Sequence, residues 1–261
     1  MRKTLFASLL GLVGLVPVLQ VQAGGLIICH DIRILPHPVP RRPIPPRPHP
    51  VFAPLELRTQ KVDVKIENQV ARTTVEQVFY NPNPRRREGT FLFPVPKGAS
   101  IKDFRMDVNG KLTKAELLPA DKARKIYTDI VRSMKDPALL EYAERDLFKV
   151  RIFPFEPHGK KTIRLTYNQV LENDAGLVEY AFPLNTAKYS SKPIEDLSIK
   201  VELDSKVPVK AIYSPTHDVE VKRKGSKNAV ISFEGKDQRP TTNFSLFYSP
   251  KQKDINVNII A

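Results

Sequence analysis

The chain has 261 residues, with 42 Lys or Arg against 28 Asp or Glu, so its formal net charge at pH 7 is +14. Its single cysteine, Cys29, excludes an internal disulfide framework. The basic residues are scattered along strand-like segments without the interleaved aromatic residues of nucleic-acid-binding modules, which argues against a nucleic-acid partner. Two interpretations stay open: a solvated basic surface, or binding to an anionic partner such as an acidic polysaccharide or an acidic protein.

The first 23 residues have the pattern of a secretory signal peptide. Arg2 and Lys3 precede an apolar run over residues 5–19, and Val21-Gln22-Ala23 is the small-x-small pattern that precedes cleavage. An uncleaved N-terminal anchor is the alternative, but no apolar run reaches the ~20 residues of a transmembrane helix. The sequence therefore predicts export to the periplasm, the cell surface or the medium, with no transmembrane span after cleavage. For Cys29, an unpaired or intermolecularly bonded thiol is favoured over lipidation, because Ile28 is a poor residue at the preceding position.

Residues 24–54 are predicted to form a Pro/Arg-rich linker. Nine prolines fall within residues 36–54. Proline favours extended polyproline II backbone, so the segment should act as a semi-rigid spacer. Arg41, Arg42 and Arg47 lie in it with no acid nearby and are candidate contacts for a polyanion. Its histidines have no scaffold that would fix the geometry of a metal site, so no metal site is predicted there.

From residue 55 onward, apolar and polar residues alternate as they do in half-buried strands. Asn109-Gly110 is a favoured two-residue hairpin turn between 104–108 and a returning strand at 112–117. Short strands punctuated by Pro, Gly and Asp predict sandwich packing. The remaining segments expected to be strands are 62–66, 70–80, 90–95, 148–152, 163–167, 197–203, 219–221, 230–233 and 244–248.

One segment has helical spacing instead. After Pro119, an apolar stripe recurs every three or four residues, and Asp136-Pro137 ends it. The stripe comprises Ala123, Ile126, Tyr127, Ile130, Val131 and Met134. It predicts a helix that packs across a sheet face or edge, with docking into a partner's groove as the alternative. The expected fold class is therefore mainly β with one prominent helix, a minor α+β variant.

The order of these segments resembles the VIT domain (vault protein and inter-alpha-trypsin inhibitor heavy-chain type). The resemblance covers residues 55–172. The landmarks that carry it are the segments 75–81, 88–99, 122–127, 139–142, 148–152, 157–159 and 162–167. It implies a β-sandwich VIT domain at 55–172, followed at 173–261 by a second small β-sandwich-like region of the kind that precedes a von Willebrand factor A domain in bacterial relatives.

The landmark positions have structural roles. Phe91 and Phe93 are expected to point inward, whereas Pro94 and Pro96 end their strand because proline lacks a backbone donor. Gly98 then permits a turn that other residues would strain to make. Tyr127 and Tyr167 are the aromatic landmarks of the helix and of the closing hairpin.

Neither a metal site nor a catalytic site is predicted. The chain stops where an A domain would begin, and the Asp-x-Ser-x-Ser site of such a domain is not matched by Asp196-Leu197-Ser198-Ile199-Lys200, because Lys200 replaces the last hydroxyl. Motifs for nucleophilic, zinc-dependent and phosphate-binding catalysis are missing from the sequence, so no catalytic or cofactor-binding residue is assigned. His158 and His217 are expected to be exposed polar residues in a turn and a loop.

These observations predict an exported, non-catalytic protein-interaction or scaffolding module of the cell envelope. Its partner could be a separate von Willebrand A-type domain that docks on residues 173–261. Two alternatives stay open: electrostatic attachment to an acidic surface polysaccharide, and a truncated fragment of a VIT–von Willebrand A adhesion-type protein. Salt distinguishes the first alternative, because binding by charge weakens at high ionic strength.

Overall fold

The computed structural model describes residues 26–30, 53–96, 98–114, 147–185 and 192–251. Within these ranges every regular element is a strand. The strands are β1 (Leu26–His30), β2 (Glu56–Glu67), β3 (Val70–Tyr80), β4 (Arg87–Pro94), β5 (Ser100–Val108), β6 (Lys111–Lys114), β7 (Leu147–Phe155), β8 (Lys160–Val170), β9 (Asn173–Asp174), β10 (Leu177–Phe182), β11 (Ile194–Asp204), β12 (Val209–Tyr213), β13 (Glu220–Lys224), β14 (Asn228–Gln238) and β15 (Phe244–Pro250).

The expected fold class, mainly β with one prominent helix, is therefore wrong for the described chain, which is all β. The period-2 alternation accounts for these elements, because strand pairing satisfies the backbone while one face of each strand is buried. The stripe from Ala123 to Met134 that predicted the helix lies outside the described residues.

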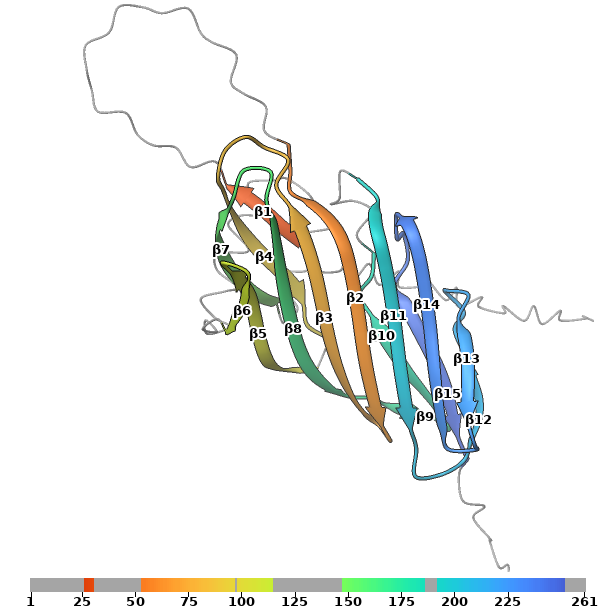
Figure 1. Ribbon diagram of the computed structural model, residues 1–261. Coiled ribbons are helices and arrows are strands. Elements are labelled where there is room, and N and C mark those ends of the chain that lie inside the picture. The colour runs from red at the N-terminus through yellow and green to blue at the C-terminus, as the bar shows by residue number, and fades with distance from the viewer. Residues whose placement is uncertain (1–25, 31–52, 97, 115–146, 186–191, 252–261) are drawn as a thin grey trace, which may run out of the picture.

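The strands form one large sheet and two small ones (Figure 1). The eight-stranded sheet has the order β13-β14-β11-β2-β3-β8-β5-β6, and the small sheets have the orders β1-β4-β7 and β12-β15-β10-β9. Both small sheets lie against the same face of the large one. Phe93 of β4 contacts Tyr167 of β8 across the layers, with ring centroids 5.8 Å apart, and Thr73 of β3 hydrogen-bonds Tyr180 of β10. A single hydrophobic core runs between the layers.

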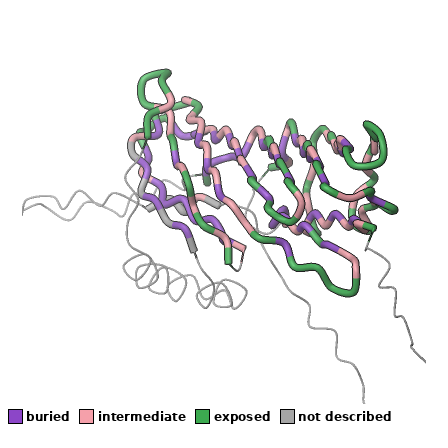
Figure 2. Tube along the Cα trace, turned by 90° about the horizontal axis from the view of Figure 1, so that it is seen from below, coloured by how far each residue is buried: buried purple, intermediate pink, exposed green. Residues whose placement is uncertain are grey.

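The alternation along β2 shows how the sequence builds this sandwich. Val62, Val64 and Ile66 are almost fully buried, whereas Lys61 and Lys65 on the opposite face are exposed. Each buried side chain of this size contributes about 1.5–3 kcal/mol relative to an exposed one. The strand predicted at 62–66 is confirmed. Figure 2 shows the same pattern along the neighbouring strands, with exposed residues gathered at the turns.

The hairpin predicted at Asn109-Gly110 is also confirmed. Val108 of β5 lies opposite Lys111 of β6, so two residues form the turn. Asn109 and Gly110 have φ angles of 55° and 81°, the left-handed values that a type I′ turn requires. Residues 115–117, the end of the expected return strand, lie outside the described residues.

The C-terminal region does not form a separate sandwich. β11 pairs in parallel with β2, from Asp196 opposite Thr59 to Asp204 opposite Glu67, so β11, β14 and β13 extend the large sheet. β10, β12 and β15 belong to the four-stranded sheet that covers the same core. The expected second small sandwich is therefore corrected to an extension of the first, because a shared sheet buries the edge of β2 and the apolar faces of both regions together.

The N-terminal part contributes one unexpected strand. β1 falls at the start of the predicted linker 24–54, and it pairs antiparallel with β4. The predicted signal peptide 1–23 and residues 31–52 lie outside the described residues. In the part of the chain that the structure describes, no helix is long and apolar enough to cross a membrane.

Candidate functional site

Two edge strands lie beside each other on one side of the sandwich. β12 is the edge of the four-stranded sheet, and β13 is an edge of the eight-stranded sheet (Figure 1, right). The Arg223 guanidinium of β13 donates hydrogen bonds to the carbonyl oxygens of Val209 (2.8 Å) and Lys210 (3.0 Å), which brings the two edges together. An edge strand leaves one row of backbone donors and acceptors unpaired within its sheet, so this side of the molecule can accept another chain.

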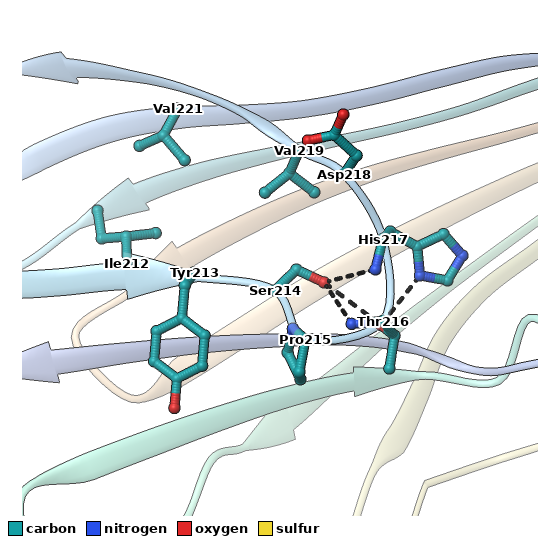
Figure 3. A pocket seen from close by; sticks show the side chains of 9 residues that line it. All are labelled: Ile212, Tyr213, Ser214, Pro215, Thr216, His217, Asp218, Val219 and Val221. Carbon is teal, nitrogen blue, oxygen red and sulfur yellow. Dashed lines mark hydrogen bonds between the residues drawn. The ribbon is translucent and has the colours of Figure 1, made fainter.

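An open cleft of about 490 Å³ separates β12 from the start of β13. Figure 3 shows Ile212, Val219 and Val221 around a shared space, with the loop 214–218 closing one end. All three apolar side chains are partly buried against the hydrophobic core. A second shallow hollow, which includes Glu220, Phe233 and other residues, adjoins the same loop. The cleft therefore combines an apolar floor with the edges of two strands, of which β12 is already engaged by Arg223 at Val209 and Lys210.

Short polar residues hold the loop in place. The Ser214 hydroxyl accepts hydrogen bonds from the amides of Thr216 (3.4 Å) and His217 (3.2 Å). The Thr216 hydroxyl accepts one from the amide of Ser245 on β15 (3.0 Å), which ties the loop to the four-stranded sheet. These local side-chain hydrogen bonds fix the turn. Pro215 prevents β12 from continuing, because proline has no backbone donor for a strand pair.

His217 is half-buried, so the expectation of an exposed residue is wrong for this histidine. Its ring packs edge-on against Phe233, with centroids 4.9 Å apart, and lies 5.4 Å from the ring of Phe244. Burial lowers the pKa of His217, which favours the neutral form of the ring. His158 is exposed in its turn, as predicted.

Ser214, His217 and Asp218 are the residue types of a hydrolytic triad, but the geometry is different. The His217 Nδ1 atom lies 2.9 Å from the Thr216 hydroxyl, and the Ser214 hydroxyl is engaged by backbone amides. A serine nucleophile needs its hydroxyl bonded to the histidine ring. Among the described residues, no group of three or more His, Cys, Asp or Glu side chains could hold a metal ion. The arrangement in this cleft is suited to binding.

An aromatic pair extends the site onto the outer face of the four-stranded sheet. Tyr213 stacks on Phe247, with ring centroids 5.5 Å apart and an interplanar angle of 16°, and Tyr213 is 45% exposed. By strand register, the neighbouring outward positions are Glu179, Ala181 and Ser245. Aromatic side chains are enriched at protein interfaces relative to the rest of the surface.

The outer face of the eight-stranded sheet has a different character, because its charges are paired with one another. The pairs are Lys61–Asp63 (3.4 Å), Lys65–Glu202 (4.0 Å), Lys200–Glu202 (2.6 Å), Arg164–Glu76 (2.9 Å), Lys222–Glu220 (3.0 Å) and Lys236–Asp196. Exposed pairs of this kind contribute little stability. They do neutralise the lysines locally, so the described part of this face is not a continuous basic surface.

The structure places the aromatic landmark residues of β4 and β8 in the core. Phe91 and Phe93 of β4 and Tyr167 of β8 are almost fully buried, and the rings of Phe91 and Phe93 stack. Pro94 is the last residue of β4, Pro96 follows it, and Gly98 has a φ of 74°, a conformation that side chains rarely adopt. Tyr127 and the arginines Arg41, Arg42 and Arg47 lie outside the described residues.

Sequence reasoning missed the cleft. No strand was expected at 177–182 or 209–213, and Tyr213 was not selected. A signal was present at 209–213, because Val209, Ile212 and Tyr213 lie between Pro208 and Pro215 and favour a short strand.

Comparisons with known proteins are consistent with this architecture. A family model described as the Vault protein inter-alpha-trypsin domain matches residues 57–167. The human inter-alpha-trypsin inhibitor heavy chain H6 is 25% identical over 172 residues, which cover 66% of this chain and 13% of that protein. The human von Willebrand factor A domain-containing protein 5A is 29% identical over 133 residues, which cover 50% of this chain and 17% of that protein. The chain thus spans less than a fifth of either relative.

A solved structure has a related fold. The crystal structure of a "putative nutrient binding protein" from Legionella pneumophila superimposes with a TM-score of 0.52 and 14% sequence identity. The superposition covers 75% of this chain and 67% of that one. At this identity the similarity concerns the fold alone.

Proposed function

Because residues 57–167 of this chain are a VIT domain, we propose that the protein is an exported, non-catalytic interaction module of the cell envelope. It binds a protein partner at the open side of the sandwich between β12 and β13. The proposal of export rests on the signal-peptide pattern of residues 1–23. The proposal of binding rests on the cleft itself.

The observation that carries the proposal is a cleft with an apolar floor and a polar loop at one end, which lies between two strand edges. β13 is the more regular edge, since its five residues pair with β14 without interruption, whereas the pairing of β12 shifts register between Val209 and Ile212. An extended partner segment can therefore continue the ladder at β13. Its alternate side chains would reach Val219 and Val221, while Lys224 favours an acidic side chain on the opposite face.

The names of the relatives suggest the class of partner. One relative is a von Willebrand factor A domain-containing protein, and a separate domain of that type is the partner that we propose for this chain. Attachment to an acidic polysaccharide is the second candidate. It would depend on Arg41, Arg42 and Arg47, since several lysines on the outer face of the large sheet are paired with acids.

Affinity capture at two salt concentrations tests the proposal. The chain from residue 24 to 261 is immobilised and exposed to its own envelope extract at about 0.1 M and about 1 M salt, between which the Debye length falls from about 10 to about 3 Å. Tyr213→Asp alters the binding site, and Val108→Asp is the matched control, since Tyr213 and Val108 are 45% and 41% exposed.

We expect one stoichiometric protein at both salt concentrations with the wild type and the Val108→Asp control. Tyr213→Asp should weaken binding at least about tenfold, or about 1.4 kcal/mol, because it places a charge in the apolar contact. Loss of all capture at high salt would favour the polysaccharide alternative. Equal capture by Tyr213→Asp would show that the partner binds elsewhere.

A further inference from the structure

The outer face of the four-stranded sheet carries an acid whose neighbouring strands offer it no base. β10 pairs with β9 and β15, and none of these three strands contains a Lys or Arg, although the chain has 42 of them. Glu179 points outward from β10 and is exposed, and within the part of the chain that the structure describes it has no ion-pair partner. The carboxylate of Glu179 is therefore available to a cation from outside the chain.

This acid belongs to a row that also contains the exposed aromatic pair. Glu179 lies directly opposite Phe247 of β15, and Phe247 lies directly opposite Tyr213 of β12. Side chains directly opposite each other have Cβ atoms about 4.5–5.5 Å apart. The rings of Tyr213 and Phe247 stack with centroids 5.5 Å apart. Figure 3 shows the Tyr213 ring pointing to the side opposite Ile212, away from the cleft. The row thus places an unpaired carboxylate beside two aromatic rings.

The next outward pair leaves this row uncovered. It consists of Ala181 of β10 and Ser245 of β15, which are opposite each other and have short side chains. Tyr213 remains 45% exposed. A flat group can therefore approach the rings and the carboxylate together.

An arginine side chain matches this combination. Its planar guanidinium stacks on aromatic faces and donates hydrogen bonds to a carboxylate at the same time. The chain contains such an arrangement within its own large sheet. The guanidinium carbon of Arg58 lies 4.9 Å from the ring centroid of Tyr80, and its nitrogens pair with Glu56 and Glu195.

We propose that Glu179, Phe247 and Tyr213 form a site for an arginine side chain of the protein partner. This inference rests on the proposed function, to which it adds the chemistry of one contact. The formal net charge of the chain is +14, so the long-range field does not attract a cation and the site acts at contact distance. A partner with an acid against Lys224 and an arginine at Glu179 is thereby fixed in one orientation.

Nuclear magnetic resonance titration tests the site without the partner. The chain 24–261 is titrated with N-acetyl-arginine amide and, at the same ionic strength, with N-acetyl-citrulline amide, which has nearly the same shape and no charge. We expect saturable shifts of the ring signals of Tyr213 and Phe247 with the arginine compound. The citrulline compound should bind at least about threefold more weakly, because it lacks the charge for the ion pair and for the cation–π contact.

A matched pair of variants locates the charge that is recognised. Glu179→Gln should remove the preference for arginine over citrulline. Glu67→Gln should keep it, since Glu67 is also an exposed strand acid but lies opposite Val70 and Asp204, with no aromatic ring. Absent ring shifts, equal binding of both compounds, or a preference that survives Glu179→Gln would overturn the proposal. Ring shifts with methyl glucoside alone would overturn it as well and would assign the rings to a sugar.

Capture from envelope extract separates this inference from the proposed function. At about 0.1 M salt, Glu179→Gln should weaken binding of the captured protein at least about tenfold, whereas Glu67→Gln should not change it. If Tyr213→Asp loses the partner and Glu179→Gln retains it, the arginine site is wrong and the proposed binding surface stands. If both variants retain the partner, the proposed binding surface is wrong as well.

Discussion

Replacing Gly89 by alanine should displace β1 from β4. The new methyl carbon would lie 2.4 Å from the Ile27 Cγ2 atom, whereas non-bonded carbons prefer about 3.5–4.0 Å. Ile27 must therefore move by more than about 1 Å, and overpacking of this kind costs about 1–3 kcal/mol. The φ angle of Gly89 lies outside the left-handed region. Alanine thus adds no backbone strain, and the cost is steric.

The expected response is release of the strand, because β1 is short. Five residue pairs and one partly buried isoleucine hold it, and a net hydrogen bond contributes only about 1 kcal/mol. The overpacking cost is therefore equivalent to about one to three such bonds, which weakens the docking of β1, while Phe155 and Leu55 keep their places in the core. Ile27→Ala removes the Cγ2 atom and should restore the fit to an alanine at residue 89.

A double-mutant cycle measures the coupling. Urea unfolding of the wild type, Gly89→Ala, Ile27→Ala and the double variant gives four free energies of unfolding, and hydrogen exchange follows the amides of residues 26–30. We expect these amides to exchange rapidly in Gly89→Ala and to recover protection in the double variant, with a coupling of about 0.5–3 kcal/mol. Additive effects within about 0.5 kcal/mol would show that Ile27 does not occupy the space beside residue 89.

Three other predictions concern the core, the loop and the shared sheet. Tyr180→Phe should lower the free energy of unfolding by about 1–2 kcal/mol, because the buried Tyr180 hydroxyl hydrogen-bonds Thr73 at 3.0 Å. Tyr213→Phe, at an exposed side chain, should leave the free energy of unfolding unchanged. Urea titration measures both variants. Burial lowers the pKa of His217, so the unfolded state binds the proton more readily than the folded state. The free energy of unfolding should therefore fall as the pH falls below the ordinary histidine pKa of about 6.5. In His217→Asn this decline should be smaller, as measured by urea unfolding at pH 7.5 and pH 5. A fragment ending at residue 172 should aggregate or lack near-UV circular dichroism, because it exposes the edge of β2 that β11 covers.

The strands with a strong period-2 pattern were predictable from the sequence. Val70–Tyr80 is a strand over the whole predicted range, since alternating Val, Thr and Phe face the core and Asn81-Pro82 ends the ladder. The Asn109-Gly110 turn was predictable for a local reason, because both residues adopt positive φ at low cost. At both places the local sequence was sufficient to predict the structure.

β1 and β12 were not predictable in this way. β1 is an apolar run without alternation beside a proline-rich stretch, so its pattern does not distinguish a strand from a linker. β12 is five residues long and shifts register against β15, which places two successive residues, Lys210 and Ala211, in solvent and breaks the alternation. The cleft could not be inferred without them, because it forms between the edges of two different sheets.

The relation between the two halves of the chain depends on a contact that no local pattern encodes. β2 and β11 each show a clear alternation, and either strand alone would fit an independent sandwich. Their parallel pairing joins Val62 to Ile199 and Val64 to Val201, more than a hundred residues apart in the sequence. Such a pairing needs a long crossover between its strands, and many routes would satisfy the same hydrophobic pattern. The core that contains these side chains also contains Tyr180 and Phe182 of β10, so the sandwich that includes residues 57–167 is completed by strands that follow the family match.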